Sequence, residues 1–201
     1  SNIRDLTADF KYNAAGPVWT ADSKSIYFNA LAEGLQGIFR VNADGSITRI
    51  TKENAWYDYD SPFAIVHSAE ETQLLASWCS IDFPTELVKV AVADGKSEQI
   101  THENEHILSQ LAEHKTEARM VKTVDGKDML TWVLYPPQFD STKTYPGIVI
   151  CLGGPQGTLS QSWSYRWNYR LMSAQGYVVA LPNRRGTTAF GQEWCEQISG
   201  D

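Results

Sequence analysis

The sequence predicts β-propeller blades followed by the first strands of an open α/β sheet. Three observations lead to this fold class: a repeat in the first half of the chain, a change of pattern at Thr116, and a series of strand, glycine turn, helix and strand near the end. The chain has 201 residues, of which 42% are hydrophobic and 11% aromatic, so it is long enough to bury a core.

The repeat appears when residues 41–54 are set against residues 91–104. Asp44-Gly45 recurs as Asp94-Gly95, which is 94 − 44 = 50 positions later. Short runs of β-branched and aromatic residues, bounded by turn residues, predict strands at 25–30, 37–41, 73–78 and 86–92. Four short strands in fifty residues are typical of a propeller blade, with a simple meander as the alternative. Two blades cannot close a propeller, so we expect the rest of a parent chain or a dimer mate to cover the exposed edges.

The second half of the chain predicts different elements. Residues 118–123 and 129–135 form a hairpin around Asp125-Gly126, and Pro136-Pro137 ends its second strand. Residues 147–152 are continuously apolar, which predicts a strand buried on both faces of a parallel sheet. A helix over 162–175, ended by Gly176, and a buried strand over 177–181 follow.

Charge and composition exclude several partners. Seventeen basic and twenty-four acidic residues give a net charge of −7, which repels nucleic acid and anionic lipid. No stretch approaches the roughly eighteen apolar residues of a membrane span.

The chain starts at Ser1 without Met, so we expect that an upstream piece was removed. The compartment therefore stays open between the cytoplasm and the periplasm or secretion.

The motif His102-Glu103-Asn104-Glu105-His106 matches H-E-x-x-H, a zinc-binding pattern when it lies on a helix. Residues 101–104 are also the second copy of residues 51–54, where Lys52 occupies the first ligand position. The repeat explains the motif without a metal, so we expect no metal site and no cofactor.

The candidate site lies at the ends of the two apolar strands. Gly153 and Gly154 follow the strand at 147–152, and glycines let backbone N–H groups approach a reacting oxygen. Residues 183–194, which begin Asn183-Arg184-Arg185-Gly186, follow the next strand. Arg184 and Arg185 are candidates to contact substrate carbonyls or to order the turn that holds the glycines.

Together, the Gly-Gly-Pro turn and the Asn-x-Arg-Gly-x-x-x-aromatic-Gly-x-x-aromatic motif resemble the prolyl oligopeptidase family of serine peptidases, in its acylaminoacyl-peptidase and dipeptidyl-peptidase V branch. The resemblance implies propeller blades over 1–101, a linker over 102–116, and the N-terminal part of an α/β-hydrolase domain over 117–201. It also implies that a serine nucleophile cleaves short peptides, with Gly153 and Gly154 supplying backbone donors to the oxyanion.

Two departures from the family pattern change what this chain does alone. No serine lies in a G-x-S-x-G motif, so the resemblance implies that Ser, Asp and His lie beyond Asp201 and that the chain alone is inactive. Leu152 replaces the His or Tyr that the family has before the glycines. The alternative is a noncatalytic binding scaffold, in which the acidic aromatic segment 56–60 is a ligand-facing loop.

Overall fold

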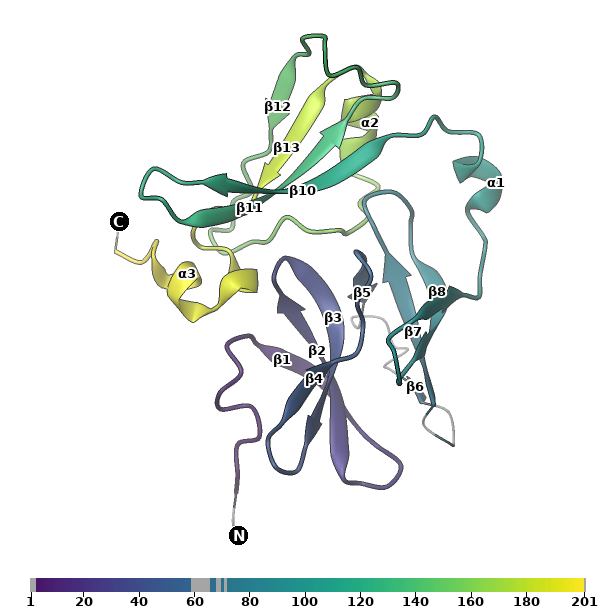
Figure 1. Ribbon diagram of the computed structural model, residues 1–201, viewed down its shortest axis with the longest axis vertical. Helices are drawn as coiled ribbons and strands as arrows, with labels where there is room; N and C mark the ends of the chain where they lie inside the picture. Colours follow the sequence, from purple (N-terminus) through teal and green to yellow (C-terminus); the bar gives the residue numbers. More distant parts are fainter. Residues whose placement is uncertain (1–2, 59–65, 68–69, 71, 201) are drawn as a thin grey trace.

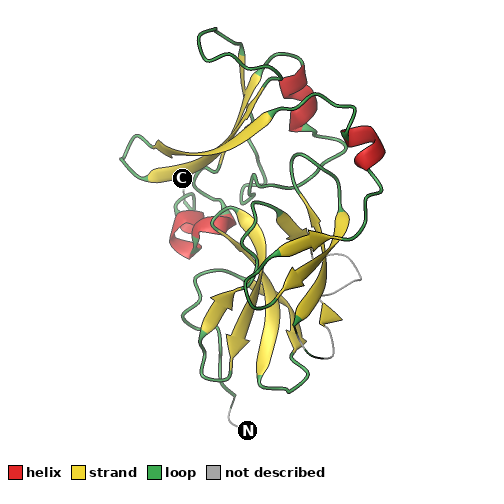
Figure 2. Ribbon diagram, turned by 45° about the vertical axis from the view of Figure 1, so that its right-hand side comes forward, coloured by secondary structure: helices red, strands yellow, loops and turns green. Residues whose placement is uncertain are grey.

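The computed structural model describes residues 3–58, 66–67, 70 and 72–200, and strands dominate them (Figures 1 and 2). The described strands form three sheets. Two lie in the lower half of Figure 1, and the third lies above them with helices α2 and α3 beside it. None of the helices in the described part of the chain is long and apolar enough to cross a bilayer.

The first two sheets are antiparallel meanders. The first has the order β1-β2-β3-β4, and the second has the order β5-β7-β8-β9 with β6 paired to β7. Their bounds are β1 Ala14–Trp19, β2 Ser25–Ala32, β3 Leu35–Asn42, β4 Ile47–Arg49, β5 Trp56–Asp58, β6 Val66–His67, β7 Gln73–Cys79, β8 Glu86–Ala91 and β9 Ser97–Gln99. The four strands predicted in this half are therefore confirmed as β2, β3, β7 and β8. Of the segment 56–60, only residues 56–58 can be placed, because Tyr59 and Asp60 lie outside the described residues.

The repeat has a direct structural counterpart. An Asp-Gly turn joins β3 to β4 and another joins β8 to β9, and Gly45 and Gly95 have φ values of +91° and +76°. These positive values suit a residue without a Cβ atom. The two sheets pack on a shared core that includes Tyr27, Leu74 and Val88, each at most 1% exposed.

The third sheet has the order β10-β11-β13-β12. Its strands are β10 Lys115–Lys122, β11 Asp128–Tyr135, β12 Gly147–Val149 and β13 Val178–Pro182. The hairpin predicted around Asp125-Gly126 is confirmed as the antiparallel pair β10 and β11, and β12 pairs parallel to β13 as expected. Val179 and Leu181 of β13 are fully buried.

Two predicted elements are shorter than expected. Strand β12 has three residues instead of six, and Val149 is 63% exposed whereas Ile148 and Ile150 pack against the core, so only one face of β12 is covered within the described part of the chain. The prediction that this strand is buried on both faces is therefore wrong here. Helix α2 spans Tyr169–Ala174 rather than 162–175, because the Asn168 side chain accepts a hydrogen bond from the Leu171 amide and begins the helix there. Its predicted glycine end is confirmed, since Gly176 has a φ of +90°.

The remaining helices are short. They are α1 Glu105–Leu108, the 3-10 turn η1 Thr188–Phe190 and α3 Gln192–Glu196. Helix α1 lies in the segment that runs from β9 to β10, and α3 lies between the third sheet and the first sheet in Figure 1.

The two repeated glycines provide a matched test of how the meanders pack. A Cβ atom at Gly95 would lie 2.0 Å from the Ile50 carbonyl oxygen, whereas at Gly45 the nearest atom would be 3.6 Å away. Both substitutions to Ala meet the same positive φ, which costs about 1–2 kcal/mol. We expect Gly95→Ala to lower the free energy of unfolding by clearly more than Gly45→Ala in urea titrations. Equal losses would contradict the close packing of the β8–β9 turn on the first sheet.

Glu86 gives the fold a defined pH dependence. This carboxylate is 4% exposed and accepts hydrogen bonds from the Thr101 hydroxyl and from the backbone and side chain of Asn104, at 3.1 and 2.8 Å. Burial raises the pKa of Glu86, but these hydrogen bonds outweigh burial, so the pKa lies below its ordinary value. Its contribution to stability is therefore present above the unfolded pKa of about 4.3 and is lost as pH falls through the lower folded pKa.

We accordingly expect the stability difference between wild type and Glu86→Gln to be constant above about pH 5 and to shrink as the pH falls below about 4. Urea unfolding at a series of pH values measures it. Glu98→Gln is the control, because Glu98 is exposed and forms a surface ion pair with Lys89 at 3.0 Å. A difference that does not change with pH would contradict the assignment.

Candidate functional site

The predicted site begins where the chain leaves strand β12. The Ile150 amide still bonds the Ala180 carbonyl at 2.9 Å, and the chain then turns away from the sheet into an exposed segment. Gly154 has a φ of +137°, which favours glycine. A Cβ atom at Gly157 would lie 2.7 Å from the Leu152 side chain, so glycine lets the turn close on itself.

The backbone donors of this turn are available. Both Gly153 and Gly154 are exposed, and neither amide donates a hydrogen bond to any residue that the structure describes. The turn lies at the carboxyl end of a parallel strand, which is where open α/β sheets place their ligands. Its two free N–H groups are therefore placed to bind an oxygen atom of a ligand.

The second predicted segment, which follows β13, contacts the chain at the end of the turn and just beyond it. Asn183 is 1% exposed, and its side chain accepts from the Leu159 amide at 2.9 Å and donates to the Leu159 carbonyl at 2.8 Å. The Trp132 indole donates to the same carbonyl at 3.1 Å. Further along, the Thr187 hydroxyl, which donates to the Arg184 carbonyl at 2.7 Å, lies 3.2 Å from the Gly157 carbonyl oxygen. The two segments are thus joined along their length by side chain to backbone hydrogen bonds.

Arg184 contacts the turn itself. Its Nη2 atom donates to the Leu152 and Pro155 carbonyls, both at 2.9 Å, and its Nη1 atom donates to the Arg185 carbonyl at 2.6 Å. Of the two roles considered for this residue, the contacts match the ordering of the turn. Direct contact of Arg184 with a substrate stays a prediction.

Arg185 points elsewhere. Its guanidinium pairs with Asp125 in the turn between β10 and β11 and lies 5.6 Å from the centre of the Trp194 ring. Hydrogen bonds from the Thr123 hydroxyl and then from Arg185 lower the pKa of Asp125, although partial desolvation opposes them. Arg185 therefore ties the hairpin turn to the segment after β13, and its predicted role in substrate binding stays untested.

Residues that follow the turn and residues that follow β13 both contact the loop between β2 and β3 of the first sheet. The Glu33 amide donates to the Ala189 carbonyl at 2.8 Å, and the Ser160 hydroxyl donates to the Gly34 carbonyl. Gln156 of the turn lines a small polar cavity of about 100 Å³, together with Lys11 and Asn13 from the start of the chain. The candidate site therefore lies against the junction of the third sheet with the first.

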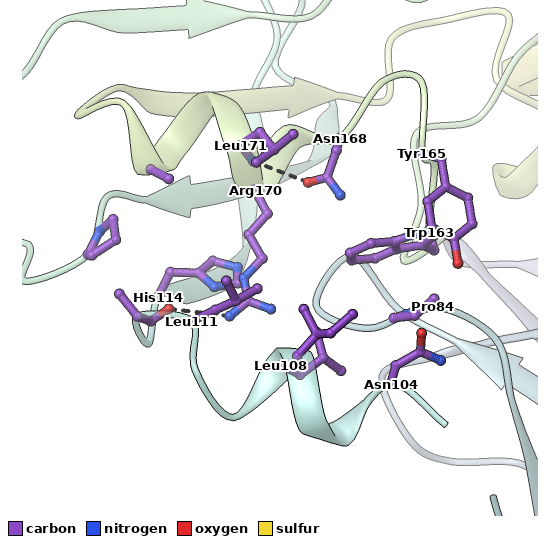
Figure 3. A pocket seen from close by; sticks show the side chains of 14 residues that line it. Pro84, Asn104, Leu108, Leu111, His114, Trp163, Tyr165, Asn168, Arg170 and Leu171 are labelled. Atoms are coloured by element: carbon purple, nitrogen blue, oxygen red, sulfur yellow. Dashed lines mark hydrogen bonds between the residues drawn. The ribbon is translucent and has the colours of Figure 1, made fainter. Parts of the chain in front are cut away.

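A second, larger cavity of about 370 Å³ lies between α1 and α2 (Figure 3). Leu108, Leu111, Trp163 and Leu171 contribute apolar surface to it, and no pattern in the sequence predicted this cavity. His114 on its wall bonds Asp82 at 2.7 Å through Nε2. The Thr116 hydroxyl faces the same nitrogen at 3.4 Å, so this group lacks the arrangement of a catalytic triad, in which base and nucleophile use opposite nitrogens.

The zinc-like motif does not adopt the geometry that its spacing requires. Helix α1 begins at Glu105, so His102 precedes it and instead bonds Glu105 at 3.3 Å. Within residues 3–58, 66–67, 70 and 72–200, no group of three or more His, Cys, Asp or Glu side chains is placed to hold a metal ion.

Comparison with known proteins gives the family. Residues 163–201 match the sequence profile of the prolyl oligopeptidase family, and the chain is 44% identical over 193 residues to dipeptidyl-peptidase 5 of Porphyromonas gingivalis. The chain belongs to the prolyl oligopeptidase family. The resemblance drawn from the Gly-Gly-Pro turn and the segment 183–194 is thereby confirmed.

This prolyl oligopeptidase-family chain spans about a quarter of the length of its curated relatives. The alignment covers 96% of this chain and 27% of the P. gingivalis protein, and a second one at 44% identity covers 88% of this chain and 25% of dipeptidyl-peptidase 5 from Porphyromonas endodontalis.

Solved structures show the same fold. Acylaminoacyl peptidase of Pyrococcus horikoshii matches with a TM-score of 0.77 at 21% identity, over 98% of this chain and 29% of that one. Dipeptidyl peptidase 4 of P. gingivalis matches with a TM-score of 0.68 at 20% identity, over 96% and 27%.

Asn183 supports the backbone beside the candidate site, a role that its place in the sequence motif did not reveal. Asn183→Leu keeps the approximate volume but leaves the Leu159 amide without a partner, whereas the Leu159 carbonyl keeps Trp132. We expect a loss of about 1–3 kcal/mol in the free energy of unfolding and faster hydrogen exchange at the Leu159 amide. The exposed Asn54→Leu should stay within about 0.5 kcal/mol of wild type. Unchanged exchange at Leu159 would contradict the role assigned to Asn183.

Proposed function

We propose that this chain is part of a serine peptidase that cleaves short peptides, and that the Leu152–Gly157 turn supplies part of its oxyanion-binding site. The observation that carries the proposal is the pair of free, exposed amides of Gly153 and Gly154 at the carboxyl end of β12. Relatives named dipeptidyl-peptidase 5 and a neighbour named acylaminoacyl peptidase support the substrate class.

The proposed reaction is acyl transfer. A serine hydroxyl attacks the carbonyl carbon of the peptide, its proton passes to a histidine, and the carbonyl oxygen becomes negatively charged. Collapse of this adduct breaks the C–N bond while the histidine returns the proton to the leaving amine, and water then releases the acyl group. Donors aimed at the oxyanion are each worth about 2.7–4 kcal/mol in comparable sites. In the proposal, Gly153 and Gly154 supply such donors through their backbones.

The division of the chain is part of the proposal. Residues 1–101 form propeller blades that screen out large folded substrates, 102–116 form a linker, and 117–201 form the first part of an α/β-hydrolase domain. The two antiparallel meanders, the repeat of 50 residues and the likeness to acylaminoacyl peptidase support this division. Since no G-x-S-x-G motif occurs in residues 1–201, the nucleophile and its partners come from outside them.

The full-length protein and the isolated chain should therefore differ in activity. We expect the full-length protein to release a chromophore from a dipeptide anilide, with an initial burst, and a serine-directed phosphonate to block this release. Residues 1–201 alone should show no turnover, because loss of the triad costs on the order of 10⁶ in kcat. A full-length protein that binds the dipeptide without cleaving it would support the alternative of a noncatalytic scaffold. Activity of residues 1–201 alone would show that the nucleophile lies within them.

A further inference from the structure

Arg184 brackets the two glycines of the turn. The Leu152 carbonyl lies one residue before Gly153, the Pro155 carbonyl lies one residue after Gly154, and one nitrogen, Nη2, donates to both at 2.9 Å. Hydrogen bonds from a guanidinium are roughly twice as strong as those between neutral groups. A single side chain therefore fixes the Leu152–Gly153 peptide unit and, beyond the glycines, the Pro155–Gln156 unit.

Fixing a carbonyl also fixes the amide that shares its peptide plane. In a trans peptide the C=O and N–H bonds point in opposite directions. Because the Leu152 carbonyl points to Arg184, the Gly153 N–H points away from Arg184. The Gly153 carbonyl lies 3.2 Å from the position that a Cβ atom of Gly157 would take, so the Gly154 N–H points away from Gly157. The contacts of Arg184 thus set the direction of at least the first of the two free donors.

The backbone of Arg184 is itself fixed by hydrogen bonds. Its carbonyl accepts from the Thr187 hydroxyl at 2.7 Å and from the Trp194 indole at 3.0 Å, and both donors lie within the same segment. The Gly186 amide bonds the Trp194 carbonyl at 3.0 Å and closes the segment. The guanidinium therefore projects from a supported backbone rather than from a free loop.

We propose that Arg184 is a positioning residue that orients the Gly153 amide toward the developing oxyanion and restrains the turn that carries the Gly154 amide, an inference that rests on the proposed peptidase function. Leu152 supplies no side-chain donor, and its side chain packs against the core of the third sheet. The turn consequently depends on its backbone donors, and Arg184 holds the first of them in the direction that the reaction needs.

The test is made in the full-length protein with Arg184→Gln, Arg184→Lys and Arg184→Ala. We expect Arg184→Gln to lower kcat on the order of 10²-fold with KM unchanged. Misdirected donors stabilise the transition state less, whereas binding of the substrate in its ground state does not depend on them. Affinity for a peptide boronate, which forms a tetrahedral adduct with the serine, should fall in parallel with kcat/KM. Arg184→Lys should be intermediate, and added methylguanidine should restore part of the kcat of Arg184→Ala.

Arg4→Gln is the matched control, because Arg4 is also exposed and donates to two backbone carbonyls of a turn, those of Ala43 and Asp44 at 3.0 and 2.8 Å. It should keep the wild-type kcat. Arg184→Gln with wild-type kcat, or with a raised KM alone, would overturn the positioning role while leaving the peptidase assignment intact. A full-length wild-type protein without hydrolysis would overturn both.

Discussion

Residues 150–168 carry the constraint on which the rest of the site depends. They connect strand β12 to helix α2 without regular secondary structure, yet residues 159–161 are buried. Buried backbone N–H and C=O groups without partners are costly, so an irregular segment of this kind needs donors and acceptors from elsewhere in the chain. Here side chains supply several of them, and Asn183 and Trp132, which bond the Leu159 amide and carbonyl, are the clearest examples.

Side chains from the end of the irregular segment and from the start of α2 also bond residues far away in the sequence. Ser160 bonds the carbonyl of Gly34, and the Gln161 side chain accepts from the Ile81 amide at 3.5 Å. Arg170, just beyond the irregular segment, donates to the Asp82 carbonyl at 2.7 Å. Each of the first two sheets therefore contributes partners to one continuous stretch of chain.

The sequence predicted most of the strands because their signals are local. Asp-Gly turns and runs of β-branched residues located β2, β3, β7 and β8, and the repeat of 50 residues located an Asp-Gly turn after β3 and another after β8, although the strand pairing beside the second turn is shifted by one residue. The predictions failed where tertiary contacts decide the outcome. Aromatic residues at 163 and 167 have a spacing that suits a helix, but Trp163 lines the cavity between α1 and α2 instead. The apolar run at 147–152 predicted burial on both faces, yet only the face that carries Ile148 and Ile150 packs against the core, because burial depends on which elements cover each face.

The candidate site was only partly predictable for the same reason. Glycines after an apolar strand identify a turn, and the motif after the next strand identifies its partner, but neither spacing reveals which side chain reaches which carbonyl. Arg184 and Arg185 are adjacent and chemically identical, yet Arg184 bonds carbonyls of the turn and Arg185 pairs with Asp125. Their difference arises from the path of the backbone after β13, which is set by contacts more than thirty positions away.

Leu152 shows how a residue that lacks a donor can fit such a site. Its side chain packs against the core of the third sheet and lies so close to Gly157 that no Cβ atom fits there. The Leu152 side chain packs on the core, while the Leu152 carbonyl accepts a hydrogen bond from Arg184. A polar residue at this position could place a donor in the site, but it would give up part of this packing. In this chain the apolar side chain anchors the turn, and the backbone amides that follow are left to provide its polar chemistry.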